Sequence, residues 1–168
     1  MSRGQVRKKL IFTQDNLKSA PPLSGRLLGV DLGVKTIGLA ISDDLNSFAL
    51  PLETVMRKKL SLDFQKISLI SREYEVSGYV VGWPLNADGS HSGGCDRVMS
   101  FVDEMYQYPN LFGEKPWVLL WDERFSTASV EEMVDKSVDM KRHKAKGYVD
   151  ALAAKVILDG ALTALKSI

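Results

Sequence analysis

The chain has 168 residues, 45% of them hydrophobic and 26% charged, and its formal net charge is +1. This length suits one domain with its own core, and no apolar run is long enough to span a bilayer. The single cysteine excludes an intrachain disulfide, and the near-zero net charge means that nucleic-acid binding would need a local basic patch.

The first 25 residues are basic, and Asp15 is their only acidic residue. We expect residues 1–25 to form a flexible extension; the alternatives are an arm that contacts phosphates and the remainder of an organellar targeting segment. Residues 26–168 then form a single domain. A cytoplasmic location is expected, or a plastid or other organelle if the basic segment belongs to a targeting signal.

Three apolar segments predict an antiparallel meander at the start of this domain. Residues 26–32 form a short apolar run that ends before Gly33, and residues 36–42 follow after a tight connection. Residues 48–55 predict a third strand, in which Pro51 indicates an edge position or a bulge.

Helices and strands alternate in the rest of the chain. In order, the patterns predict a helix at 62–74, a strand at 78–83, a Gly-rich loop at 86–94, a helix at 98–106, a buried strand at 117–121, a helix beginning at 129–133, a basic loop at 136–147 and a buried helix at 149–165. A meander followed by β-α units predicts a mixed sheet with helices on its faces.

Four acidic residues stand inside or at the ends of apolar elements. Asp31 interrupts the first strand, Asp122 and Glu123 follow the strand at 117–121, and Asp150 begins the last helix. A buried carboxylate is costly without a partner, and Mg²⁺ binds hard oxygen ligands of this kind. Two such ions about 4 Å apart can promote phosphodiester cleavage. The acids therefore indicate a shared cation site.

Each acid also has a purely structural interpretation. Asp31 can shape the turn that follows it, and Asp150 can favour a helix N-terminus through the helix dipole. Asp122 and Glu123 can pair with Arg124. Spacing alone does not show that the acids converge.

Polar and basic residues near these acids are candidates for binding nucleic acid. Lys35 and Arg124 each follow an acid closely, and Asn86 lies in the Gly-rich loop. The basic loop before the last helix contributes three more: Lys141, Arg142 and Lys144. These side chains would contact phosphates; the alternative for the basic loop is a solvated surface.

Four motifs run in the order of one known family. They are GVDLGVKTIGLAISD at 29–43, VVGWPLNADGS at 80–90, DERFSTASVEEMV at 122–134 and KGYVDALAAKVIL at 146–158. Together they resemble the YqgF/RuvX family of Holliday junction resolvases and pre-16S ribosomal RNA nucleases, from about residue 26 to the end of the chain. The resemblance implies an α/β fold of the RNase H-like type, with a mixed five-stranded sheet and helices on both faces.

The same resemblance implies a metal-dependent endonuclease. Its catalytic residues would be Asp31, Asp122, Glu123 and Asp150, and its ligands for Mg²⁺ or Mn²⁺ would be Asp31, Glu123 and Asp150. Which of the neighbouring Asp122 and Glu123 faces the metal stays open, because adjacent strand residues point to opposite faces. The strand at 78–83 lacks the acid that related resolvases carry on their fourth strand.

The implied substrate is precursor 16S rRNA or branched DNA, and the protein would act away from membranes as a monomer or a weak homodimer. Two other functions stay open. A non-catalytic nucleic-acid-binding or ribosome-associated factor would have the same fold. An ATPase related to actin and Hsp70 would share the opening hairpin, but 168 residues leave room for only one of the two domains that such ATPases close around a nucleotide.

Overall fold

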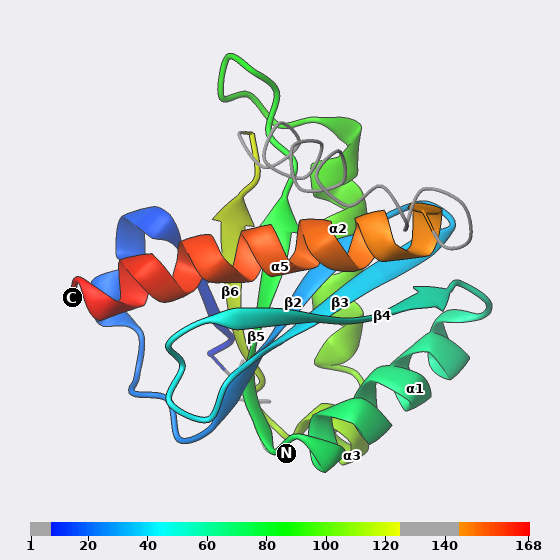
Figure 1. Ribbon diagram of the computed structural model, residues 1–168, viewed down its shortest axis with the longest axis horizontal. Coiled ribbons are helices and arrows are strands. Elements are labelled where there is room, and N and C mark those ends of the chain that lie inside the picture. Colours follow the sequence, from blue (N-terminus) through cyan, green and yellow to red (C-terminus); the bar gives the residue numbers. More distant parts are fainter. Residues whose placement is uncertain (1–7, 125–144) are drawn as a thin grey trace, which may run out of the picture.

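The computed structural model describes residues 8–124 and 145–168. Its centre is a six-stranded sheet in the order β1-β6-β5-β2-β3-β4 (Figure 1). Three neighbouring strands, β2 (Arg26–Leu32), β3 (Thr36–Ser42) and β4 (Ala49–Met56), pair antiparallel and form the predicted meander. A register shift opposite Pro51 marks the bulge expected on the edge strand β4.

Two further strands extend the sheet on the other side of β2. Both β5 (Val76–Trp83) and β6 (Trp117–Asp122) run parallel to β2, as the sequence predicts. The helix α1 (Leu60–Glu73) provides the crossover from β4 to β5, because parallel strands need a long connection. The helices α2 (Gly93–Met105) and α3 (Pro109–Phe112) lie between β5 and β6 in the chain.

The segment expected to be a flexible extension contributes a sixth strand, which corrects the predicted strand count. Leu10–Thr13 forms β1, which pairs parallel with β6, and Gln14–Ser19 forms the 3-10 helix η1. The apolar run LIFT is too short to stand out in the sequence. Its place depends on distant packing, since the rings of Phe12 and Trp117 lie 5.7 Å apart.

The last helix, α5 (Ala145–Lys166), begins before Val149, the predicted start. The first turn of α5 therefore contains no acidic residue, and Asp150 lies beyond it. This corrects the expectation that Asp150 stands at the helix N-terminus and interacts with the helix dipole. The predicted helix from 129–133 and the basic loop up to residue 144 lie outside the described residues. No helix in the described ranges has the length and apolarity needed to cross a membrane.

The two faces of the sheet carry different helices. Figure 1 shows α5 lying across one face, with α2 behind the sheet. On the α1/α2 face, large residues from the strands and helices form one core cluster, which includes Val30, Phe64, Val81, Phe101 and Leu120. On the α5 face, a second cluster includes Leu27, Ala40, Val80, Leu119 and Leu158. Helices on both faces of the sheet agree with the predicted fold class.

Candidate active site

Strand alternation places Asp31 on the α5 face of the sheet. Leu27 belongs to the core cluster beneath α5, and a Cβ on Gly29 would lie 2.8 Å from the carbonyl oxygen of Ala154 in α5. Side chains along a strand alternate between faces, so Asp31, which has the same parity as residues 27 and 29, also faces α5. Its burial between the sheet and this helix follows from that position.

The same rule separates Asp122 from Glu123. Leu119 belongs to the α5-side cluster, and a Cβ on Gly160 of α5 would meet the indole of Trp121. The backbone N–H of Glu123 donates to the carbonyl oxygen of Trp83 at 3.4 Å, which continues the parallel ladder past the end of β6. Glu123 therefore shares the α5 face with Asp31, while Asp122 points to the opposite face.

Two glycines allow the acids to approach one another. Gly38 pairs directly with Asp31 across β2 and β3, and a Cβ there would overlap the backbone carbonyl of Asp150. Gly82 on β5 has the same role beside Glu123, because a Cβ would overlap the carboxylate Oε2. Glycine at both positions lets α5 and the Glu123 side chain lie directly against the sheet, beside Asp31.

Hydrogen bonds fix the part of α5 that carries Asp150. The Thr36 hydroxyl, at the start of β3, donates to Oδ2 of Asp150 at 2.8 Å. The Thr54 hydroxyl, on β4, donates to the backbone carbonyl of Gly147. The meander thus holds α5 from two strands and orients one oxygen of the Asp150 carboxylate.

Electrostatics confirm that three carboxylates share one environment. Burial raises the pKa of Asp31 from 3.8 to about 6, and repulsion from Asp150 adds to this effect. Burial also raises the pKa of Glu123 from 4.5 to about 7, with further contributions from the charges of Asp31 and Asp122. Asp31 is therefore the central member, since it interacts with both other acids on the α5 face.

These acids do not form a ready coordination shell in the described ranges. Within residues 8–124 and 145–168, no group of three or more His, Cys, Asp or Glu side chains is arranged to hold a metal ion. The chemistry of the donors nevertheless fits Mg²⁺ or Mn²⁺, because all three are carboxylates and the pKa values of two are raised by burial and by other acids. A divalent cation would convert that repulsion into attraction.

Asp122 has a different partner. Oδ2 of Asp122 lies 2.6 Å from the guanidinium of Arg124, and the Arg124 backbone N–H donates to Oδ1 at 3.0 Å. Burial alone would raise the pKa of Asp122, but the hydrogen bonds and charge of Arg124 hold it below its ordinary value. The side-chain amide oxygen of Gln14 accepts the Asp122 N–H at 3.0 Å. The ion-pair interpretation therefore holds for Asp122, which the structure does not place with Asp31 and Asp150.

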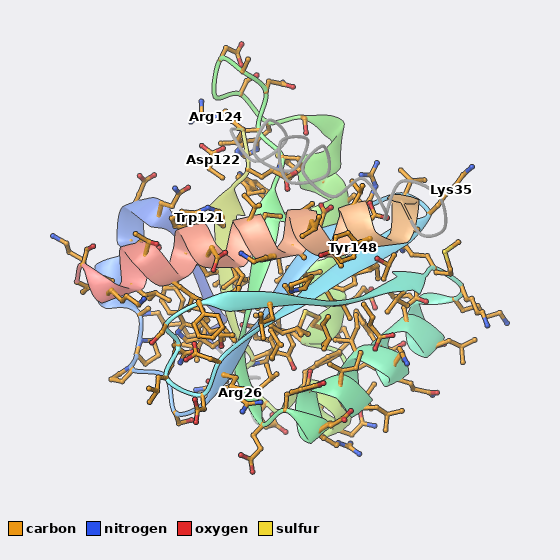
Figure 2. All side chains as sticks on the ribbon, in the orientation of Figure 1. Arg26, Lys35, Trp121, Asp122, Arg124 and Tyr148 are labelled. Carbon is orange, nitrogen blue, oxygen red and sulfur yellow. The ribbon has the colours of Figure 1, made fainter. Side chains whose placement is uncertain are left out.

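The predicted nucleic-acid-binding residues occupy different positions. Lys35 is exposed at the tip of the β2–β3 hairpin, while Arg124 lies beside Asp122 beyond the end of β6 (Figure 2). Asn86 donates to the Ser90 hydroxyl at 2.9 Å and to the carbonyl of His91 at 3.3 Å, so it shapes its own loop. The remaining three candidates, Lys141, Arg142 and Lys144, lie outside the described residues.

Sequence analysis did not single out Thr36, Gly38, Gly82 or Gln14. Thr36 and Gly38 lie within the first motif, in the segment KTIGLA, and Gly82 lies within the second. Their motif membership was a usable signal, but their roles depend on where α5 and Glu123 lie. Gln14 gave no signal, because it acts from a segment expected to be flexible.

The fold is that of the RNase H-like resolvases. The structure of Thermus thermophilus RuvC superposes with a TM-score of 0.51 at 12% identity, covering 84% of this chain and 96% of that one. At this identity the likeness shows the fold alone.

Sequence comparison identifies the family. The family model described as "RuvX: Holliday junction resolvase" matches residues 25–164, and the chain belongs to this family. A relative from Rhodospirillum centenum is 44% identical over 150 residues, covering 89% of this chain and 79% of the relative. One from Rhodobacter capsulatus is 38% identical over 151 residues, covering 90% and 91%. Both carry the name "Putative pre-16S rRNA nuclease". The family inferred from the four motifs is confirmed.

Proposed function

We propose that this nuclease hydrolyses phosphodiester bonds with Mg²⁺ or Mn²⁺ held by Asp31, Glu123 and Asp150. The observation that carries the proposal is the common α5 face of these three carboxylates, linked through the central Asp31. Asp122 has a supporting role in this proposal, because its carboxylate is engaged by Arg124.

Each of the three acids has a distinct part. Asp31 stands on a central strand, where the ladder fixes its backbone. Asp150 is oriented by the hydroxyl of Thr36. Glu123 is ionised only as the pH approaches about 7, unless a cation lowers its pKa. A divalent cation would supply positive charge that activates water and stabilises the charge developing on the scissile phosphate.

The substrate that we propose is precursor 16S rRNA, as the names of the curated relatives indicate. The family description points to branched DNA as the second candidate. Lys35 and Arg124 would contact the phosphate backbone on either side of the acids, together with Lys141, Arg142 and Lys144. These contacts would position the strand without reading its sequence.

The test is cleavage of a substrate panel by the full chain. The panel contains precursor 16S rRNA, single-stranded RNA and four-way DNA junctions, with Mg²⁺, Mn²⁺ or a chelator. We expect cation-dependent cleavage, strongest on the precursor rRNA, and its loss in Asp31→Asn. The matched control Asp96→Asn, an exposed change on α2, should cleave like the wild type.

Two outcomes would overturn parts of this proposal. Binding of the panel without cleavage in any cation would indicate a non-catalytic nucleic-acid-binding factor with the same fold. Cleavage that persists in Asp31→Asn would show that the three acids are not the catalytic group.

A further inference from the structure

Exposed apolar side chains gather along the edge strand β4. Those on the strand or next to it in the structure are at least 47% exposed, and they are Leu45, Phe48, Leu50, Met56 and Leu62. Large apolar side chains gathered on one surface mark a site of interaction, whereas isolated ones do not. The patch is away from the acids of the α5 face and calls for a partner of its own.

The free edge of β4 lies between two cavities. Within the described residues, β4 pairs only with β3. A cavity of about 480 Å³ adjoins it on the α5 side, lined in part by Leu52 and Tyr148. Another of about 360 Å³ adjoins it on the α1 side, lined in part by Met56 and Leu62. A neighbouring strand would therefore find space for side chains on both faces.

The two ends of β4 carry opposite charge. Asp43 and Asp44 precede the strand, and Arg57, Lys58 and Lys59 follow it. A second β4 lying antiparallel would bring the basic end of each copy to the acidic end of the other. A parallel arrangement would place like charges together. The complementary surface for this edge is thus present on the same chain.

We propose that a second copy of this chain docks on β4, with the two strands antiparallel about a twofold axis near Leu52 and Glu53. Such a contact is isologous, so each patch meets itself in reverse. Leu50 of one copy then lies beside Val55 of the other, next to the cavity lined by Met56 and Leu62. The proposal does not depend on the proposed cleavage chemistry.

Side chains dominate the proposed contact. Pro51 lacks an N–H and the bulge interrupts the strand, so the edge cannot extend a continuous hydrogen-bonded ladder. Near the axis, Glu53 of each copy is accompanied by Lys66, whose Nζ lies 3.5 Å from Oε2, and this offsets repulsion between the two carboxylates. Such an interface forms a dimer that dissociates on dilution.

The first test is sedimentation of the full chain over a range of concentrations. We expect a reversible monomer–dimer equilibrium, weakened at least tenfold by Leu50→Lys. The matched control Leu69→Lys changes an equally exposed apolar residue on α1 and should leave the equilibrium unchanged. A monomer at every concentration up to about 0.5 mM, or equal effects of both variants, would overturn the proposal; K_d values of this order mark weak contacts.

The second test examines the antiparallel arrangement. Lys59→Glu and Asp44→Lys should each weaken the dimer, and the double variant should restore it, because each copy then presents reversed charges to the other. A Glu53→Cys variant should form a disulfide-linked dimer on oxidation, whereas Leu69→Cys should not; the native Cys95 is buried and does not compete. Failure of the double variant to restore association, or equal cross-linking at both positions, would rule out a twofold axis at the centre of β4.

Discussion

The two faces of the sheet differ in the size of the residues that cover them. The α1/α2 face is packed with large side chains, and Phe64 alone makes edge contacts with the rings of Phe101 and Phe112, each 5.1 Å away. The α5 face places glycine at 38 and 82, where any Cβ would collide. One face therefore stabilises the fold through volume, and the other gives up volume so that α5 can approach the acids.

The comparison is sharpened most strongly by a pair of substitutions on opposite faces. Phe64→Ala should lower the free energy of unfolding by about 3–5 kcal/mol, the usual cost of a large core truncation. Cleavage per folded molecule should stay unchanged. Gly38→Ala should cost only about 1–3 kcal/mol of stability, typical of overpacking, yet reduce cleavage severely because α5 must move. Chemical denaturation and single-turnover cleavage measure the two effects, and equal loss of activity in both variants would contradict the division.

The neighbouring acids after β6 offer the next comparison, since they point to opposite faces. Glu123→Gln should slow cleavage about 10²-fold or more, as expected when a group that holds the catalytic ion is lost. Asp122→Asn breaks a partly exposed pair with Arg124 and should slow it less than about tenfold. Rates under saturating Mg²⁺ decide between them, and a larger loss in Asp122→Asn would reverse the assignment of faces.

The buried acids should also make stability depend on pH. The pKa of folded Glu123, about 7, lies above the ordinary 4.5, so protonation favours the folded state. Without divalent cations, this group's contribution is most favourable below pH 4.5 and is lost as the pH rises to about 7. The wild type should therefore lose about 1–3 kcal/mol relative to Glu123→Gln across this window. Denaturation series at fixed ionic strength measure the difference, and parallel pH profiles would show that Glu123 is not in the proposed environment.

Thr36 should have the smallest effect, because it touches the site only through Asp150. Thr36→Val removes the hydrogen bond to Oδ2 and should slow cleavage about tenfold, in line with the roughly 1.5 kcal/mol of a bond to a charged group. Thr36→Ser keeps the hydroxyl and should restore most of the rate. An equal loss in both variants would assign Thr36 a packing role instead.

The sequence predicted the meander, the parallel β5 and β6 and the family, because apolar runs and motif order are local signals. It could not predict β1, whose four residues depend on Trp117 for their place. It left Asp122 and Glu123 undecided, because alternation assigns faces only once the neighbours of Trp121 are known. The start of α5 was also missed, since the basic residues before Val149 hide the continuation of the helix.

The central claim is that Asp31, Glu123 and Asp150 bind one cation site on the α5 face. Binding of Mn²⁺ to the full chain, measured by electron paramagnetic resonance at pH 7.5, tests this without relying on cleavage or on the substrate. We predict that Asp31→Asn and Glu123→Gln each weaken Mn²⁺ binding by about tenfold or more, in the range of one lost carboxylate interaction, while Asp122→Asn retains it. Wild-type affinity in Asp31→Asn, or a loss in Asp122→Asn as large as in Glu123→Gln, would contradict the account.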